Sequence, residues 1–77
     1  MAEPNYQPIA CILHERLEFS VLRRIPLMLE YSGQKLRVLP LDVATRNGAE
    51  WLKFRHEDGK EEEIRLDRIT SFKEILA

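Results

Sequence analysis

The first third of the chain places mainly apolar residues at helical spacing. One side of the expected helix carries residues at i, i+4, i+8 and i+11, namely Leu13, Leu17, Val21 and Arg24. The opposite side carries Glu15 and Glu18. Neither Gly nor Pro interrupts residues 9–24, and Pro26 ends the pattern because proline cannot continue a helix. The sequence therefore predicts a helix over residues 9–24, preceded by a flexible stretch of residues 1–8.

The remainder of the chain alternates apolar and polar residues with a period of two, which is typical of strands with one buried face. Five strands are expected, over residues 25–31, 35–38 with a continuation through 41–43, 50–56, 62–66 and 69–72. Pro40 predicts a bulge, a bend or an edge in the second strand, because proline cannot donate to a sheet. Asn47-Gly48 is the pair preferred in type I′ hairpins, and Asp58-Gly59 is a second hairpin signal.

Five short strands at this spacing favour a small barrel over a sandwich, since closure removes exposed sheet edges. An OB barrel inserts its helix between the third and fourth strands, but only residues 57–61 lie there. An Sm-like barrel begins with a helix and continues with five bent strands. We therefore expect a mainly β fold, a five-stranded Sm-like barrel over residues 25–72 with one N-terminal helix, and an SH3-like barrel as the second choice.

Length and charge restrict the classes of function. The 77 residues suffice for one domain, residues 1–77. Twelve Lys and Arg against 13 Asp and Glu give a formal net charge of −1, which argues against general nucleic-acid binding. Cys11 is the only cysteine, so an intramolecular disulfide cannot form. The chain has no signal-peptide pattern and no apolar run of about 18 residues, so a cytoplasmic location is expected.

The few residues of the chain that could serve catalysis or bind a metal are scattered. Catalysis requires a nucleophile with a base, or an acid with a base, in one pocket. His14, His56 and Cys11 do not fall into such an arrangement, and their spacing matches no set of metal ligands. We expect neither enzymatic activity nor a cofactor or metal.

The outward side of the expected helix is the first candidate binding surface. Glu15 and Glu18 lie there, and Ile12, Phe19 and Leu22 project beside them. If the opposite side of the helix covers the barrel, these apolar residues are partly exposed, which suggests a partner surface.

A strand face is the second candidate. Trp51, Lys53 and Arg55 alternate on one strand and, with Arg37, could bind RNA by stacking and by charge. Packing against neighbouring strands would explain the same residues. The acidic residues around the Asp58-Gly59 hairpin are expected to form a solvated turn.

Two segments of the chain resemble the Rho-binding antiterminator family, also called Rof. They are Tyr6-Gln7-Pro8-Ile9-x-Cys11 followed by Leu17-Glu18, and Leu66-Asp67-x-Ile69-Thr70-Ser71-Phe72. Further residues follow the family's order between them: Leu27-x-Leu29-Glu30, Gly33-x-Lys35-Leu36, Asp42, Arg46 and Glu50-Trp51-Leu52. The resemblance covers residues 6–72, and the joint order of the motifs is more specific than any one of them.

The resemblance implies an Sm-like fold and a binding partner, the hexameric transcription terminator Rho. Family members occupy the region of Rho's N-terminal domain that takes up nascent RNA, so their carboxylates replace phosphates there. The resemblance implies that Glu15 and Glu18 are anionic contacts. We expect His14, Phe19 and Ile12 to be supporting contacts. Ile12-Leu13 stands where the family tends to carry acidic residues, which either weakens Rho binding or shifts part of the interface to apolar contact.

The resemblance also separates the alternatives. A Rho inhibitor is expected to bind no nucleic acid directly and to be a monomer when free. The alternative is a small Sm-like RNA-binding module that uses Trp51, Lys53, Arg55 and Arg37.

Overall fold

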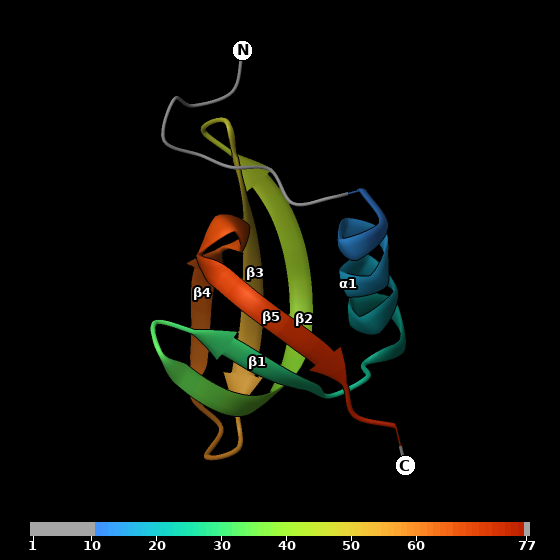
Figure 1. Ribbon diagram of the computed structural model, residues 1–77, viewed down its shortest axis with the longest axis vertical. Helices are drawn as coiled ribbons and strands as arrows, with labels where there is room; N and C mark the ends of the chain where they lie inside the picture. The colour runs from blue at the N-terminus through green and yellow to red at the C-terminus, as the bar shows by residue number, and fades with distance from the viewer. Residues whose placement is uncertain (1–10, 77) are drawn as a thin grey trace.

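A computed structural model of the chain describes residues 11–76, so the expectations for residues 1–8 and for the first two residues of the helix lie outside the described part (Figure 1). The order of elements is α1 (Cys11–Arg23), β1 (Leu27–Tyr31), β2 (Gln34–Arg46), β3 (Ala49–His56), β4 (Glu61–Arg65), the 3-10 turn η1 (Leu66–Arg68) and β5 (Ile69–Glu74). The mainly β class with one N-terminal helix is confirmed.

The five strands form one antiparallel sheet in the order β4-β3-β2-β1-β5. Figure 1 shows β1 and β5 crossing in front of the other three strands, so the sheet bends over itself. Because β4 and β5 are its outer strands, hydrogen bonds do not close the sheet, and η1 joins these two strands covalently. The word barrel therefore describes the curvature of the sheet and not a closed hydrogen-bond network.

The second strand passes through Pro40 without interruption. The pairing register between β2 and β3 shifts between Pro40 and Asp42, where Pro40 is opposite Phe54 and Asp42 is opposite Lys53. One extra residue, Leu41, is thus accommodated as a bulge, which agrees with the expected consequence of a proline in a paired strand. The bulge bends β2 and allows it to pair with β1 along one half and with β3 along the other.

The core contains the inward-facing side chains of the strands, of which Leu27, Leu29, Leu52 and Phe54 are fully buried. These residues lie at alternate positions of β1 and β3, as the period of two in the sequence requires. α1 adds Leu17, which is also fully buried, and half-buried Val21 packs against the same cluster.

The C-terminal end of α1 stops through its backbone, just before Pro26. Ile25 N–H donates to the Ser20 carbonyl at 2.9 Å, and Arg24 N–H donates to the Val21 carbonyl at 3.2 Å. These two bonds, with Arg24 at φ 54°, form a Schellman motif with a non-glycine residue in the left-handed position. The motif fixes the direction in which the chain leaves α1 and enters β1.

α1 is also far shorter than a membrane-spanning segment, and no helix in residues 11–76 is long and apolar enough to cross a membrane.

Candidate partner-binding surface

The outward side of α1 is an exposed surface of mixed apolar and acidic character. Ile12 is 68% exposed, Phe19 52% and Leu22 77%. Glu15 and Glu18 are exposed on the same side of the helix. The opposite side carries the buried residues of α1, so the helix covers the sheet with one face and presents these five residues to solvent. We call these five residues the α1 outer surface.

Contacts within the α1 outer surface leave most of it free. The Arg23 guanidinium lies 5.3 Å from the centre of the Phe19 ring, a cation–π distance. His14 Nδ1 lies 3.3 Å from a Glu18 carboxylate oxygen. Glu15 makes no side-chain hydrogen bond or ion pair with the described residues. Within residues 11–76, Glu15 is thus the carboxylate of this surface without an internal partner.

His14 is placed differently from the other predicted contacts. Its side chain is only 23% exposed, and Nε2 lies 2.5 Å from a Glu50 carboxylate oxygen. This contact is an ion-pair distance without the alignment of a hydrogen bond. His14 therefore connects α1 to β3 between two carboxylates, and its accessible part is small.

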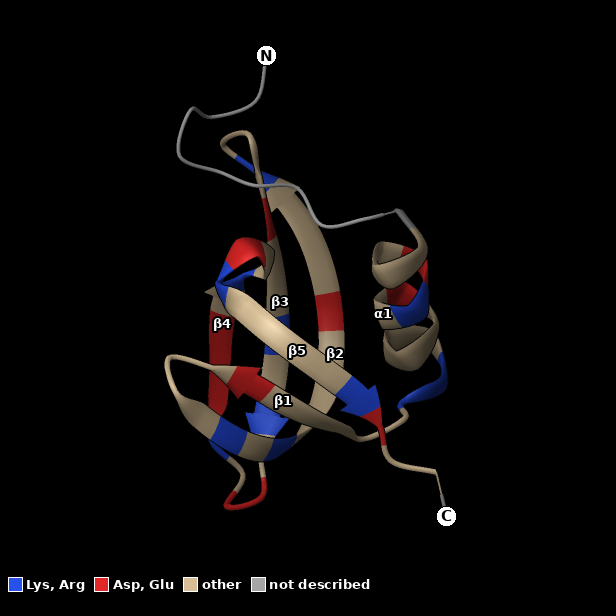
Figure 2. Cartoon of the chain, in the orientation of Figure 1, with Lys and Arg blue, Asp and Glu red and all other residues tan. Residues whose placement is uncertain are grey.

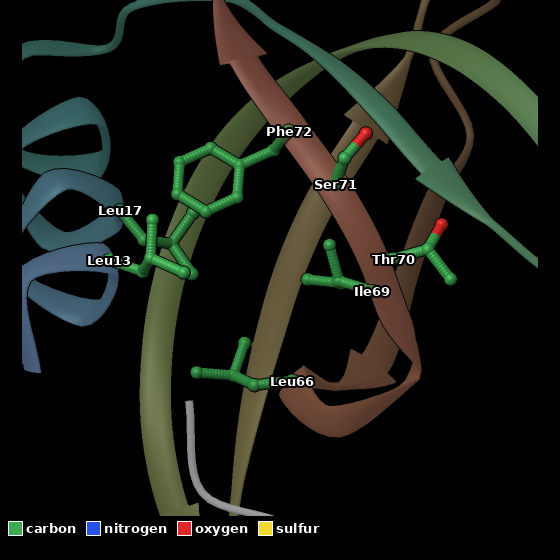
Figure 3. Close-up of a pocket in the computed structure, with 7 residues that line it drawn as sticks. All are labelled: Leu13, Leu17, Leu66, Ile69, Thr70, Ser71 and Phe72. Carbon is green, nitrogen blue, oxygen red and sulfur yellow. The ribbon is translucent and has the colours of Figure 1, made fainter. Parts of the chain in front are cut away.

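A second feature near α1 is an apolar cavity that the sequence did not predict. Its volume is about 190 Å³, and it lies between α1 and β5 (Figure 3). Its lining consists of Leu13, Leu17, Leu66, Ile69, Thr70, Ser71 and Phe72. The helical stripe predicted that Leu13 covers the sheet. This residue is instead 37% exposed, so the covering at this position is incomplete. The walls come from opposite ends of the chain, so no local pattern could reveal the cavity.

The alternative RNA-binding residues do not form one free basic surface. Glu61 pairs with both cations of β3, since it lies 3.5 Å from Lys53 Nζ and 3.0 Å from Arg55 Nη2. The hydrogen bond from Arg55 lowers the pKa of Glu61, which favours the charged carboxylate. Arg37 lies with Arg55 at one shallow hollow, whereas Trp51 is four residues further along β3, about 13 Å away.

Trp51 also has a neighbour within the protein. The Arg46 guanidinium lies 5.1 Å from the centre of the indole ring, and Arg46 forms an ion pair with Glu63 of β4. A base that stacks on Trp51 would have to displace this cation from the ring.

The acidic residues near the second hairpin are divided between the turn and β4. Glu57 and Asp58 are exposed in the turn, as expected. Glu62 accepts a hydrogen bond from Tyr31 Oη at 3.2 Å and lies 2.8 Å from His56 Nε2. Burial raises the pKa of Tyr31, and the nearby charge of Glu62 raises it further. The carboxylates of β4 therefore make contacts within the sheet.

Residues 11–76 contain no group of three or more His, Cys, Asp or Glu side chains that could hold a metal ion.

Comparison with known proteins identifies two relatives. They are named Protein rof and come from Escherichia coli (strain K12) and Shigella flexneri. Each is 38% identical to this chain over 69 residues, an alignment that covers 88% of this chain and 81% of the relative. No family model matches the chain.

Proposed function

This chain belongs to the Rof family, and on that basis we propose that it inhibits the transcription termination factor Rho by binding to Rho's N-terminal RNA-binding region. The single observation that best supports this proposal is the α1 outer surface. Two carboxylates and three large apolar side chains stand exposed on one helix face while the opposite face covers the sheet. Exposed apolar residues beside charges are the composition expected of a protein-binding surface.

The chemistry of inhibition would be competition for a basic site. A region built to bind RNA phosphates attracts carboxylates, and Glu15 and Glu18 would occupy it in place of the RNA. Such charge complementarity accelerates association and orients the partner more than it adds affinity. The apolar residues Ile12 and Phe19 would supply the contact that slows dissociation.

His14 has a supporting role in this proposal. It lies between Glu18 and Glu50, so its imidazole would restrict the positions that the Glu18 carboxylate can take. Direct contact between His14 and Rho would be limited to the 23% of its side chain that is exposed.

The proposal is tested by charge reversal on the helix. Glu15→Lys should abolish capture of the protein by purified Rho, and should also abolish its ability to displace single-stranded RNA from Rho. Glu57→Lys is a matched control, because it changes an exposed carboxylate by the same charge at the distant hairpin. Both variants should keep the circular dichroism spectrum and melting temperature of the wild type. Rho binding by a folded Glu15→Lys, Glu18→Lys double variant at the wild-type level would refute the proposal.

Salt dependence separates the two parts of the interface. Exposed charges are screened beyond about 8 Å at physiological ionic strength, so an interface dominated by Glu15 and Glu18 should weaken as salt is raised. Binding that does not change with salt would assign the interface to Ile12 and Phe19 instead.

The alternative function, an RNA-binding module, has a direct test. A filter-binding titration with single-stranded RNA should give no binding by the protein alone, because Glu61 already pairs with Lys53 and Arg55. RNA binding that Trp51→Ala removes would favour the alternative.

A further inference from the structure

A shallow hollow between the C-terminal half of α1 and the middle of β2 shares Glu18 and Leu22 with the α1 outer surface. Val21, Leu22 and Val43 form its apolar lining, and Glu18 and Asp42 supply one carboxylate from each element. Its volume is about 190 Å³. Figure 2 shows the acidic band of β2 beside α1. The hollow is thus apolar along its lining and acidic at its rim.

The charge of Asp42 is not neutralised within the described part of the chain. Asp42 is exposed, and its carboxylate makes no hydrogen bond or ion pair with residues 11–76. Its neighbour across the sheet is Lys53, whose ammonium group lies 3.5 Å from Glu61 of β4 instead. Arg24, the other nearby cation, donates from Nη1 to the carbonyls of Pro40 and Leu41 at 3.2 and 2.6 Å. Asp42 therefore remains available to a cation from outside.

We propose that this hollow receives an arginine side chain of the protein partner. The aliphatic stem of an arginine would lie on Leu22 and Val43, and its guanidinium would reach the carboxylates of Glu18 and Asp42. Arginine suits the hollow better than lysine, because its planar fork can bond two carboxylates and because it is less strongly hydrated. The binding surface therefore extends from α1 onto Asp42 and Val43 of β2. The pattern of residues along the helix could not indicate this extension.

The occupant can be tested without any partner protein. An NMR titration of the ¹⁵N-labelled protein with N-acetyl-arginine methylamide should shift the amide signals of Leu22, Asp42 and Val43. The neutral isostere N-acetyl-citrulline methylamide, at the same concentration and ionic strength, should not shift them. Asp42→Asn should remove the arginine-dependent shifts, and Glu57→Gln should keep them. Shifts that are equal for the two ligands, or that spread over all acidic residues, would overturn the proposal.

The identity of the partner needs a separate test, because the assignment of the partner as Rho rests on the proposed function and the arginine site does not. Asp42→Asn should weaken capture by Rho about fivefold, the fold-change of an exposed ion pair at the upper end of its usual range. Glu57→Gln loses the same charge and should bind as the wild type does. A wild-type protein that binds Rho while Asp42→Asn binds equally well would overturn the arginine site and leave the proposed function standing. Arginine-specific shifts in a protein that does not bind Rho would support the arginine site and overturn the proposed function.

Discussion

Arg16 and Glu74 connect the first and last elements of the fold through a pair of hydrogen bonds. Arg16 Nε donates to Glu74 Oε2 at 3.0 Å, and Nη2 donates to Oε1 at 2.7 Å. The same guanidinium lies 5.0 Å from the centre of the Phe72 ring. This arrangement holds α1 against β5 beside the apolar cavity. The hydrogen bonds from Arg16 also lower the pKa of Glu74 below its ordinary value of 4.5.

The lowered pKa leads to a prediction about acid stability. A carboxylate with a lowered pKa in the folded state stabilises the protein above the unfolded pKa of 4.5, and this contribution is lost as the pH falls through the folded value. Glu74→Gln should therefore melt below the wild type at pH 7, and the difference should shrink as the pH falls below 4.5. Thermal melts from pH 7 to pH 3 measure this effect. Glu57→Gln, which removes an exposed carboxylate, should follow the wild type throughout, and a constant difference for Glu74→Gln would contradict the assignment.

At the scale of one element, one face of α1 packs in the core and the other face is exposed to solvent. Leu17 is fully buried in the core, and Ser20, also fully buried, donates its hydroxyl to the Arg16 carbonyl at 3.0 Å. Leu22, less than two turns further along, is 77% exposed. The same residue type thus stabilises the fold at one position and forms part of a binding surface at another.

This division can be measured with two identical substitutions. Leu17→Ala should lower the free energy of unfolding by about 2–5 kcal/mol, because it removes buried methyl groups and leaves a cavity. Leu22→Ala should change it by less than about 0.5 kcal/mol, as is usual for exposed sites. Urea denaturation followed by circular dichroism measures both variants. Equal losses would mean that α1 does not dock on the sheet by the face described.

At the scale of the whole molecule, the open sheet leaves two outer strands. β4 carries Glu61, Glu62 and Glu63 in succession, and all three are exposed. Charged residues on an outer strand oppose pairing with a second chain, since they would bring like charges together. Each of the three also contacts a cation or a histidine within the sheet: Glu61 contacts Lys53 and Arg55, Glu62 contacts His56, and Glu63 contacts Arg46 of β2.

We therefore predict that the free protein is a monomer. Light scattering coupled to size-exclusion chromatography should give the mass of one 77-residue chain at all concentrations tested. A dimer or a ring would contradict the prediction and would show that the edges of β4 and β5 do pair.

Much of the fold could be predicted from local patterns. The hairpin between β2 and β3 turns at Asn47-Gly48, where φ is 52° and 76°, as the type I′ signal requires. The inward residues of β1 and β3 followed from a period of two. The continuation of β2 beyond Pro40 was also expected, but the choice of a bulge over a bend or an edge was not, because a bulge depends on which residues the neighbouring strand places opposite it.

The candidate site could be predicted only in part. The exposed face of α1 followed from the helical period, since a stripe that covers the sheet leaves the other side in solvent. The ion pairing of the basic residues on β3 did not follow, because Glu61 reaches Lys53 and Arg55 only once β4 pairs with β3.

The sequence by itself determined the helix, the strands, most turns, the core positions of the sheet and the resemblance to the Rof family. These are consequences of residue type and short-range spacing, which act before the chain is folded. The tertiary structure alone decided that Asp42 joins Glu18 at one hollow, that Arg16 reaches Glu74, and that the sheet stays open. Each of these depends on residues far apart in the chain, whose meeting is set by strand pairing and by the packing of α1.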